Sequence, residues 1–444
     1  MKTPRIEGLG RNGTWRNWAA SSIAVPQNIS VPADEDEIIA ALGSANETGS
    51  TLKVVGGAHS FTPIAATTGT LMSLDRFSGI IHVDLSTNQV RFKAGTRLRD
   101  IGRLLLPYGL ALANMGDIDH QSLAGAISTS THGTGLGFTG FSGMVTALRI
   151  VLPTGEVREC NAQQYPELFQ AARVGLGALG VLTEITLQCV PRFKLLAREE
   201  PEPLAGMLES FVDRVVLTDH LEFYWFPYTQ TALTKTNTRL PENTPVDPVP
   251  WRSRILDDEL MGNGAFALLC RLGAKVPATV PSINKLAAKA LAARTYTDQS
   301  EHVFVAPRRV RFREMEYAVE LSALPTVFAA VRRVLESCPE RITFPLEVRA
   351  TAADDTWLGT ASGRQSAYIA VHRYAGEPSS EFFKKIEEVF IHYGGRPHWG
   401  KLHTQGAGYL ASTYPRFDDF LAQRDAVDPS GVMLNEHLGH VLGR

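Results

Sequence analysis

The chain has 444 residues, of which 44% are hydrophobic and 20% are charged, a composition typical of a globular protein and not of a disordered one. Its formal net charge of -2 gives no electrostatic reason to expect a nucleic acid or an anionic membrane as partner, so a small, polar, uncharged substrate fits better. The length allows two domains, or one large α/β unit with an inserted piece.

Four cysteines are far apart in the sequence and form no CxxC pair: Cys160, Cys189, Cys270 and Cys338. This spacing argues against a zinc site and against a disulfide framework, so we expect no metal and a reducing compartment. The N-terminal segment has no apolar core of signal-peptide length, and no later run approaches the ~18 apolar residues of a membrane span. The sequence therefore predicts a cytoplasmic protein without a membrane partner.

The first part of the chain predicts a mixture of helices and strands. Residues 24–43 predict a strand edge, a turn and then a helix, which begins in an acidic run and ends near Gly43. Residues 51–58 predict a buried strand that ends in a glycine turn, and residues 69–96 predict several short strands. Residues 97–112 have apolar side chains at helical spacing and predict a helix that proline and glycine close.

The middle of this region, residues 114–143, is packed with glycine, serine, threonine and alanine and has few large side chains. Strands are predicted again at residues 144–160 and 177–190. Together these segments predict one α+β domain over residues 1–191, which is a common domain size.

The pattern changes beyond this first domain. Residues 220–240 predict an aromatic-rich pair of strands, residues 363–374 a further strand, and residues 381–395 an amphipathic helix. We expect a second α+β domain over residues 192–400, and a C-terminal segment, residues 401–444, that packs back on the first domain.

The dinucleotide-binding pattern GxGxxG occurs twice, at Gly8, Gly10 and Gly13 and at Gly175, Gly177 and Gly180. The nicotinamide-type fold requires a strand before this pattern and a helix after it, because the helix N-terminus holds the pyrophosphate. The first copy follows no buried strand, and the second is followed by a strand. Both copies fail on context, which makes a nicotinamide-linked dehydrogenase a poor alternative.

Two glycine-rich segments indicate a phosphate ligand. The first glycine loop, Gly56–Ser60, and the second glycine loop, Gly125–Gly135, can both bring backbone N–H groups close to phosphate oxygens because glycine has no Cβ. Alone, the first loop could be a tight turn with a satisfied histidine, and the second a flexible surface loop. Their presence together favours a diphosphate ligand, to which the second loop adds the hydroxyls of Ser128, Thr129, Ser130 and Thr131.

Three separated motifs carry a resemblance to a known family: "VVGGAHSF" at residues 54–61, "NMGDIDHQSLAGAISTSTHGTG" at residues 114–135 and "PHWGK" at residues 397–401. They resemble the sugar-lactone and alditol oxidases of the vanillyl-alcohol-oxidase flavoprotein superfamily, above all the gulonolactone and arabinonolactone oxidases. The resemblance extends from about Trp18 to the C-terminus. It implies a two-domain α+β fold, with an FAD-binding domain of the PCMH type at residues 1–191 and a cap domain for the substrate at residues 192–400.

The resemblance also implies the residues that bind FAD. In the family the first loop wraps the pyrophosphate, and its histidine, here His59, commonly carries the flavin through an 8α-histidyl bond. Such a bond raises the reduction potential of the flavin and prevents its loss. The implied cofactor-binding residues are Val54, Val55, Gly56, Gly57, Ala58, His59, Ser60, Gly116, Asp117, Ser122, Gly125, Ser128, Thr129, Ser130, Thr131, His132 and Val181.

The implied substrate side consists of Glu347, Arg349, His372 and Lys401, together with Asp117. Glu347 and Arg349 alternate along a predicted strand and so share one face. From the residues alone, a surface salt bridge, a structural histidine and a solvated loop lysine remain the plain alternatives. In the resembling oxidases the Glu-x-Arg pair binds substrate hydroxyls, and the lysine stabilises the reduced flavin or the forming alkoxide.

The implied reaction is the oxidation of an aldono-1,4-lactone such as L-gulono-1,4-lactone. An alcohol carbon gives a hydride to flavin N5, and oxygen is then reduced to hydrogen peroxide. Gly116 favours oxygen as the acceptor, because related dehydrogenases have a larger residue there that is thought to keep oxygen from the flavin. An alditol (xylitol or sorbitol) oxidase, a lactone dehydrogenase with another acceptor, and a flavin-binding protein without turnover remain as alternatives. Asp117 weakens the alditol reading, because alditol oxidases have serine at this position.

Overall fold

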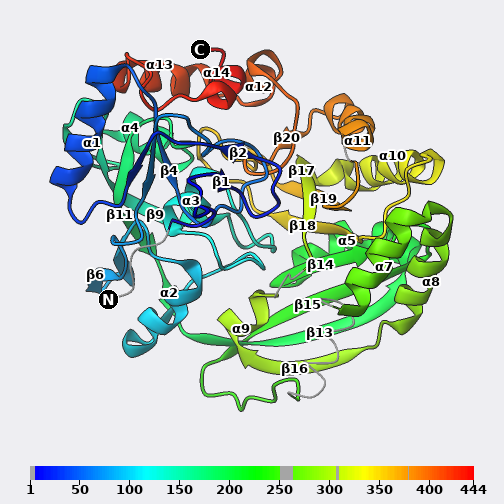
Figure 1. Ribbon diagram of the computed structural model, residues 1–444. Coiled ribbons are helices and arrows are strands. Elements are labelled where there is room, and N and C mark those ends of the chain that lie inside the picture. The colour runs from blue at the N-terminus through cyan, green and yellow to red at the C-terminus, as the bar shows by residue number, and fades with distance from the viewer. Residues whose placement is uncertain (1–5, 251–263, 307–309, 379) are drawn as a thin grey trace.

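The computed structural model describes residues 6–250, 264–306, 310–378 and 380–444 (Figure 1). The N-terminal part contains two main sheets and two short strand pairs. The smaller has three parallel strands in the order β3-β5-β4, namely Asn28–Ser30, Thr70–Ser73 and Leu52–Val55. The larger is antiparallel and has the strand order β10-β9-β11-β7-β6, namely Val157–Asn161, Val145–Val151, Val181–Gln188, Gln89–Lys93 and Ile80–Asp84.

Helices and short strand pairs surround these two sheets. The short pairs are β1 with β2 (Trp15–Arg16 and Ile23–Ala24) and β8 with β12 (Leu110–Ala111 and Val190–Pro191). The helices of this part are α1 (Glu35–Thr48), α2 (Leu98–Leu105), α3 (Leu123–Ser128) and α4 (Pro166–Arg173).

A second sheet system follows in the chain, an antiparallel sheet of eight strands in the order β16-β13-β15-β14-β18-β19-β17-β20. Their bounds in that order are Arg294–Gln299, Phe193–Pro203, Thr231–Pro241, His220–Trp225, Leu346–Thr351, Ser366–Tyr374, Phe312–Glu320 and Arg396–Pro397. Its helices are α5 (Leu204–Leu217), α7 (Gly264–Lys275), α8 (Val280–Ala290), α9 (Ser300–Phe304), α10 (Leu324–Ser337) and α11 (Ser380–His392). In Figure 1 this sheet lies beside the N-terminal part, with α10 and α11 over one end of it.

The two faces of the eight-stranded sheet have opposite character. Alternate residues of its central strands, such as Met315, Val348 and Ile369, belong to an apolar core that they form with α5, α10 and α11. Because side chains alternate across a strand, the residues between them point to the other face. That other face carries buried charged side chains, and it faces the N-terminal part of the chain.

A larger apolar core joins distant parts of the sequence. It contains Ile38 of α1, Ile150 of β9 and Ile185 of β11, and also Phe420 and Leu438 from the C-terminal helices. These C-terminal helices are α12 (Ala407–Thr413), α13 (Phe417–Val427) and α14 (Glu436–Leu442), and Figure 1 shows α13 beside α4. Side chains from inside the expected cap, Val303 and Trp357 among them, join the same core.

Most predicted elements are confirmed, and two are wrong in detail. The helix expected to end near Gly43 continues to Thr48, and Gly49 ends it with φ of 61°. A Cβ on Gly43 would meet no atom within 4 Å, so this glycine needs no turn and the helix passes through it. The second glycine loop is not wholly loop, because α3 extends into its first residues as far as Ser128. Ser122 caps this helix by accepting from the Gly125 N–H at 3.2 Å.

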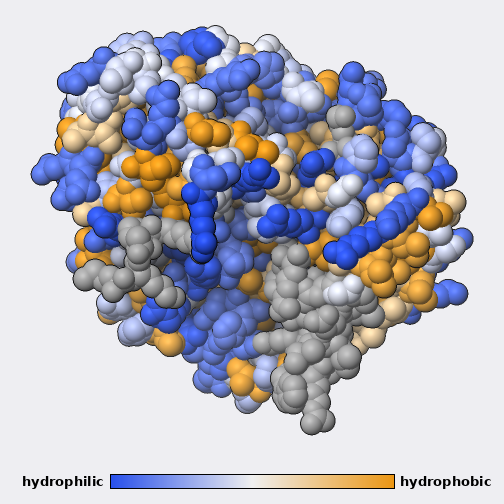
Figure 2. All heavy atoms as spheres, in the orientation of Figure 1, coloured by the Kyte–Doolittle hydropathy of each residue, from blue (hydrophilic) through white to orange (hydrophobic). Residues whose placement is uncertain are grey.

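The surface and the cysteines also bear on the sequence expectations. All four cysteines are buried and form no disulfide. Across the described ranges, no helix combines the length and the apolar character that a membrane span requires. Figure 2 shows a mainly hydrophilic face with a hydrophobic area over α7 and α8, where Leu268 and Leu286 are exposed.

Candidate active site

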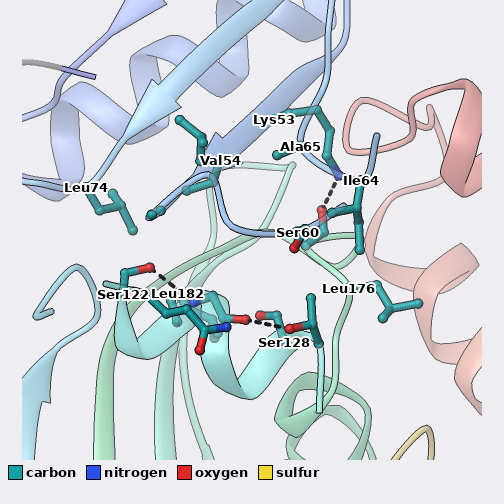
Figure 3. A pocket seen from close by; sticks show the side chains of 18 of the residues that line it. Lys53, Val54, Ser60, Ile64, Ala65, Leu74, Ser122, Ser128, Leu176 and Leu182 are labelled. Carbon is teal, nitrogen blue, oxygen red and sulfur yellow. Dashed lines mark hydrogen bonds between the residues drawn. The ribbon is translucent and has the colours of Figure 1, made fainter. Parts of the chain in front are cut away.

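The first cavity, of about 110 Å³, lies where β4 enters the first glycine loop. Figure 3 shows Lys53 and Val54 approaching it from β4, with Ser122 and Ser128 at the two ends of α3 across from them. Its lining is mostly apolar or glycine, and it extends to the second GxGxxG segment through Gly175, Leu176 and Gly177. Three segments that are far apart in the sequence therefore meet around one elongated space.

The paired glycines of the first loop are required by close packing against the segment that precedes α3. A Cβ on Gly56 would lie 2.2 Å from the Ser122 hydroxyl oxygen, and one on Gly57 would lie 2.5 Å from the His120 carbonyl oxygen. Ala58 follows with φ of 54°, in the left-handed region that side chains seldom adopt. The glycines thus bring the first loop into contact with the segment leading into α3, and the chain turns sharply into His59.

A second and larger cavity, of about 460 Å³, adjoins the first. His59, Ser60, Gln121 and Thr129 line both cavities, so the two spaces are neighbours. The second cavity is lined largely by polar and charged side chains. Its lining includes residues of the charged sheet face and of the "PHWGK" segment.

The His59 ring lies between two other aromatic rings at the junction of the cavities. Trp18 stacks on it with centroids 5.5 Å apart and His120 with centroids 5.3 Å apart, at interplanar angles of 21° and 10°. Burial, helped by the nearby charges of His120, Lys401 and Arg97, lowers the pKa of His59 to about 3. The imidazole is therefore neutral at physiological pH and keeps a lone pair available as a nucleophile.

The segment that carries Lys401 packs directly on the first glycine loop. The Phe61 N–H donates to the Gly400 carbonyl at 2.7 Å, and the Thr62 hydroxyl donates to the Trp399 carbonyl at 3.1 Å. The Lys401 ammonium lies 5.2 Å from the centre of the Phe61 ring. The histidine of the first motif and the lysine of the third consequently share one cavity, although some 340 residues separate them.

Lys401 forms an ion pair with Glu314 of β17. The other oxygen of this carboxylate lies 3.5 Å from Nε2 of His372, whose Nδ1 lies 3.0 Å from the Pro345 carbonyl. Burial alone would lower the pKa of Lys401, but the charges of Glu314 and Glu316 outweigh it and raise that pKa above its usual value. Lys401 is thus a fixed cation at the wall of the cavity.

Arg349 is the centre of a second buried charge cluster. Its Nε donates to Glu222 at 2.8 Å, and its Nη2 is paired with Glu347 and lies 3.5 Å from an oxygen of Asp117. The Arg349 side chain is only 9% exposed, and these three carboxylates raise its pKa well above the usual value against the effect of burial. Lys235 adds a second cation 3.8 Å from Glu222.

His132, Glu316 and His398 form a third cluster, with candidate ligand atoms within 4.8 Å of one another. The Gly400 N–H donates to Nδ1 of His398 at 3.0 Å, so the proton of this neutral ring is on Nε2. That nitrogen has no free lone pair for a cation. Glu316 lies 3.3 Å from Nε2 of His132 and close to the Lys401 charge, so polar contacts of this carboxylate explain the cluster.

The structure brings most of the predicted site residues to the two cavities. The first cavity is lined by Val54, Val55, Gly56, Gly57, Ala58, His59, Ser60, Ser122, Gly125, Ser128 and Thr129. The second is lined by Gly116, Asp117, Thr131, His132, Glu347, Arg349, His372 and Lys401, together with His59, Ser60 and Thr129.

Two predicted cofactor-binding residues line neither cavity. Ser130 has φ of 61°, and its hydroxyl accepts from the Thr360 N–H at 3.1 Å, so this side chain links the second glycine loop to the chain after β18. Val181 is fully buried in the larger core, and its neighbours Gly180 and Leu182 line the first cavity instead.

Sequence reasoning missed several polar residues of the site. Glu314 and Glu316 alternate with apolar residues along β17 as Glu347 and Arg349 do along β18, and this spacing is a signal in the sequence. Lys53 was also missed. Its ammonium donates to the Gly177 and Met433 carbonyls, each at 2.9 Å, and burial lowers its pKa to about 7.

The residues present fit an FAD molecule. The first cavity is narrow and largely apolar, with backbone groups of both glycine loops around it, as a nucleotide and its phosphates require. The adjoining second cavity is wider and carries charged groups, as a flavin ring with a polar substrate requires. His59 lies where the two meet.

Comparison with known proteins agrees with this geometry. A family model described as D-arabinono-1,4-lactone oxidase matches residues 185–441, and a model described as FAD binding domain matches residues 26–161. The chain is 40% identical to an L-gulono-1,4-lactone dehydrogenase of Mycobacterium tuberculosis, over 97% of this chain and 99% of that protein. It is 30% identical to the L-gulonolactone oxidase of Bos taurus, over 96% and 98% of the two chains.

Two further comparisons extend the range of relatives. An alditol oxidase of a Streptomyces species is 29% identical over 96% of this chain and 98% of its own length. A cholesterol oxidase variant from Brevibacterium sterolicum has a TM-score of 0.81 at 17% identity and covers all of both chains. At that identity the likeness concerns the fold alone, and together with the match to the FAD binding domain it agrees with the expected α+β flavoprotein fold.

Proposed function

Because the chain belongs to the D-arabinono-1,4-lactone oxidase family of FAD-binding proteins, we propose that it oxidises an aldono-1,4-lactone such as L-gulono-1,4-lactone. The observation that carries this proposal is the shared cavity of His59, Arg349 and Lys401. This second cavity adjoins the first cavity, where FAD would bind, and its charged groups can bind several hydroxyls at once. The buried, unpaired cysteines support a reducing, cytoplasmic location.

FAD, when bound, supplies the acceptor for the hydride that leaves the alcohol carbon. His59 supports a covalent link to it, because the ring is neutral, fixed between Trp18 and His120, and located at the junction of the two cavities. The backbone of the first glycine loop and the hydroxyls of Ser122 and Thr129 would hold the phosphates.

The charged sheet face would bind and orient the lactone. Glu347 can accept hydrogen bonds from ring hydroxyls, the His372 ring offers a further polar contact, and Asp117 faces the same space. Arg349 and Lys401 are cations held in place before the substrate arrives. They stabilise the negative charge that develops as the reacting hydroxyl loses its proton, and they need no rearrangement to do so.

Oxygen is the proposed electron acceptor, with hydrogen peroxide as its product. Gly116 lines the second cavity, and a Cβ there would lie 3.0 Å from the His132 carbonyl oxygen, so a larger residue would crowd this part of the cavity wall. The relative from Mycobacterium tuberculosis is named a dehydrogenase, which favours a second candidate, the same oxidation with another acceptor.

The test is to purify the holoprotein and to follow flavin reduction without oxygen, using L-gulono-1,4-lactone, D-arabinono-1,4-lactone, xylitol and sorbitol. Reduction by a lactone and not by the polyols is expected, and fast reduction by polyols alone would support the alditol oxidase alternative. Arg349→Ala and Lys401→Ala should each lower the reduction rate constant by about 10²–10³-fold, the cost of losing one preorganised charge partner. Wild-type rates in both variants would remove these residues from the mechanism.

The acceptor is tested separately with the reduced wild-type protein. Rapid reoxidation by oxygen with stoichiometric hydrogen peroxide is expected. Negligible peroxide, with rapid transfer of electrons to an artificial dye, would show that the physiological acceptor is another molecule.

A further inference from the structure

Strand β17 presents two buried carboxylates to the substrate cavity that no motif above assigned. Met315 and Tyr317 of this strand pack into the apolar core with the helices, so Glu314 and Glu316 point to the opposite, charged face. Both line the second cavity, and each residue is only 6% exposed. An ionised carboxylate at such a depth is costly unless it is paired, so each must have a defined partner.

Glu314 has two partners, one on each oxygen. Oε2 pairs with the Lys401 ammonium, and Oε1 lies 3.5 Å from Nε2 of His372, which is directly opposite Glu314 in the β17–β19 ladder. The Leu402 N–H donates to the backbone carbonyl of Glu314 at 2.8 Å. The main chain of Lys401 and its neighbour is therefore fixed to the same strand position that holds its side chain.

We propose that Glu314 is a positioning residue that keeps Lys401 permanently charged and directed at the reacting centre, so that Lys401 acts as an electrostatic partner and not as the base. This rests on the proposed function only in giving Lys401 a role toward the substrate. Glu314 acts through Lys401 and does not contact the reacting hydroxyl itself.

The charges around Lys401 support this assignment. From β17 it faces Glu314 and Glu316, and Asp117 adds a third negative charge from the loop after residue 114. From β19, His372 shares the Glu314 carboxylate with Lys401. His398, on its own segment, and His59, on the first glycine loop, also lie near it, and burial lowers the pKa of these two rings to about 3. Both of these rings are therefore neutral, and neither is a cationic neighbour of Lys401 at physiological pH.

Removing the Glu314 charge would change the balance that keeps the lysine protonated. Burial acts to lower the pKa of Lys401, and Glu314 is the largest of the charges that oppose it. In Glu314→Gln burial still lowers the pKa of Lys401, but the largest charge that raises this pKa is gone. The pKa of Lys401 should then fall, and the lysine should lose its charge at an alkaline pH where the wild-type lysine still carries it.

The experiment compares wild type, Glu314→Gln, Glu314→Asp and the matched control Glu320→Gln, which changes an exposed carboxylate on the same strand. The rate constant of flavin reduction by the lactone is measured without oxygen from about pH 6 to about pH 10. The midpoint potential of the bound flavin is measured over the same range and needs no substrate.

Near pH 6 we expect Glu314→Gln to approach the wild-type rate, because its lysine is still protonated. At higher pH the rate should fall by about tenfold per pH unit above a new, lower pKa, while Glu314→Asp and Glu320→Gln follow the wild type. The potential of Glu314→Gln should show the same alkaline transition. The double variant Glu314→Gln/Lys401→Arg should lack it, because a guanidinium stays charged throughout this range.

A loss of rate by the same factor at every pH, with no new transition in rate or potential, would overturn the proposal and leave Glu314 a packing role. If Glu314→Gln does not fold, the wild type and Lys401→Arg decide. If the wild-type rate constant falls as the pH rises through the neutral range, and Lys401→Arg does not show this fall, then Lys401 loses its charge in the wild type. That result refutes the proposal. If no lactone reduces the wild-type flavin, the proposed function fails, and the potential measurement still tests Glu314.

Discussion

Arg349→Met tests how much the ion pairs of the second charge cluster contribute to the free energy of unfolding. The substitution removes the guanidinium and keeps an unbranched side chain in its place. It leaves the carboxylates of Glu222, Glu347 and Asp117 facing one another with Lys235 as the remaining cation near Glu222. A unit-charge pair about 4 Å apart is worth roughly 4 kcal/mol at the effective dielectric of about 20 that suits protein sites. Removing one partner of a buried pair costs about 3–5 kcal/mol, and we expect that loss in the free energy of unfolding near pH 8.

The pH dependence of this loss gives the prediction its specificity. Burial raises the pKa of Glu222, and Arg349 is the largest of the charges that hold it below its usual value. In the wild type the carboxylate therefore stabilises the fold above the unfolded-state pKa, and this contribution is lost as the pH falls. In the variant burial prevails and raises the pKa, so the folded protein takes up a proton as the pH falls and the penalty shrinks. The difference between the two proteins should thus be largest near pH 8 and smaller near pH 5, by about 1.4 kcal/mol per unit of pKa change.

The assay is urea unfolding followed by tryptophan fluorescence at several pH values, with the flavin content of each preparation measured alongside. Arg158→Met is the matched control, because Arg158 pairs with Glu156 at a site where the two side chains are 27% and 48% exposed. That pair is solvent-exposed and screened, so its loss should change the free energy of unfolding little. Equal losses in the two variants, or a loss in Arg349→Met that does not change with pH, would refute the reasoning.

Three further predictions concern single residues of the cofactor side. Lys53→Met should remove a pH-dependent part of the free energy of unfolding. Because the pKa of Lys53 is about 7 in the folded protein, the stability of the wild type relative to the variant should rise by about 1.4 kcal/mol per pH unit above about pH 7. Urea unfolding curves whose difference does not change with pH would contradict this prediction. His59→Ala should release all FAD into the supernatant on acid precipitation, while the wild-type pellet stays yellow; a colourless wild-type pellet would rule out the covalent link. Gly116→Ala should slow reoxidation by oxygen and leave flavin reduction by the lactone unchanged, because its Cβ fills space beside the His132 carbonyl; equal slowing of both steps would point to a general distortion instead.

Whether a site residue can be predicted from the sequence depends on whether its local pattern is distinctive. Glu347 and Arg349 were detectable because they alternate along a strand whose other residues are apolar, and the structure places both on the charged face of β18. Glu314 and Glu316 have the same spacing on β17, so one and the same rule would have found them. Glu222 is the one acidic residue of β14, a strand rich in aromatic residues, so no alternation of charges marks it. Arg349 becomes its partner because β14 lies beside β18 in the sheet. Strand order is a property of the folded chain that local pattern does not contain.

The glycine-rich segments also show what local sequence cannot predict, namely which parts of the chain lie against them. Composition identified both loops as sites of close backbone approach, but it did not say what approaches them. At Gly56 and Gly57 the neighbours are Ser122 and the His120 carbonyl, so these glycines first serve to join the two loops, and the cavity forms beside that contact. The sequence predicts that the Ser130 hydroxyl faces a ligand, yet this residue has a positive φ and its hydroxyl contacts Thr360. A run of four hydroxyl residues has no fixed face until the backbone of each one is known, because a single left-handed residue redirects the side chains on either side of it.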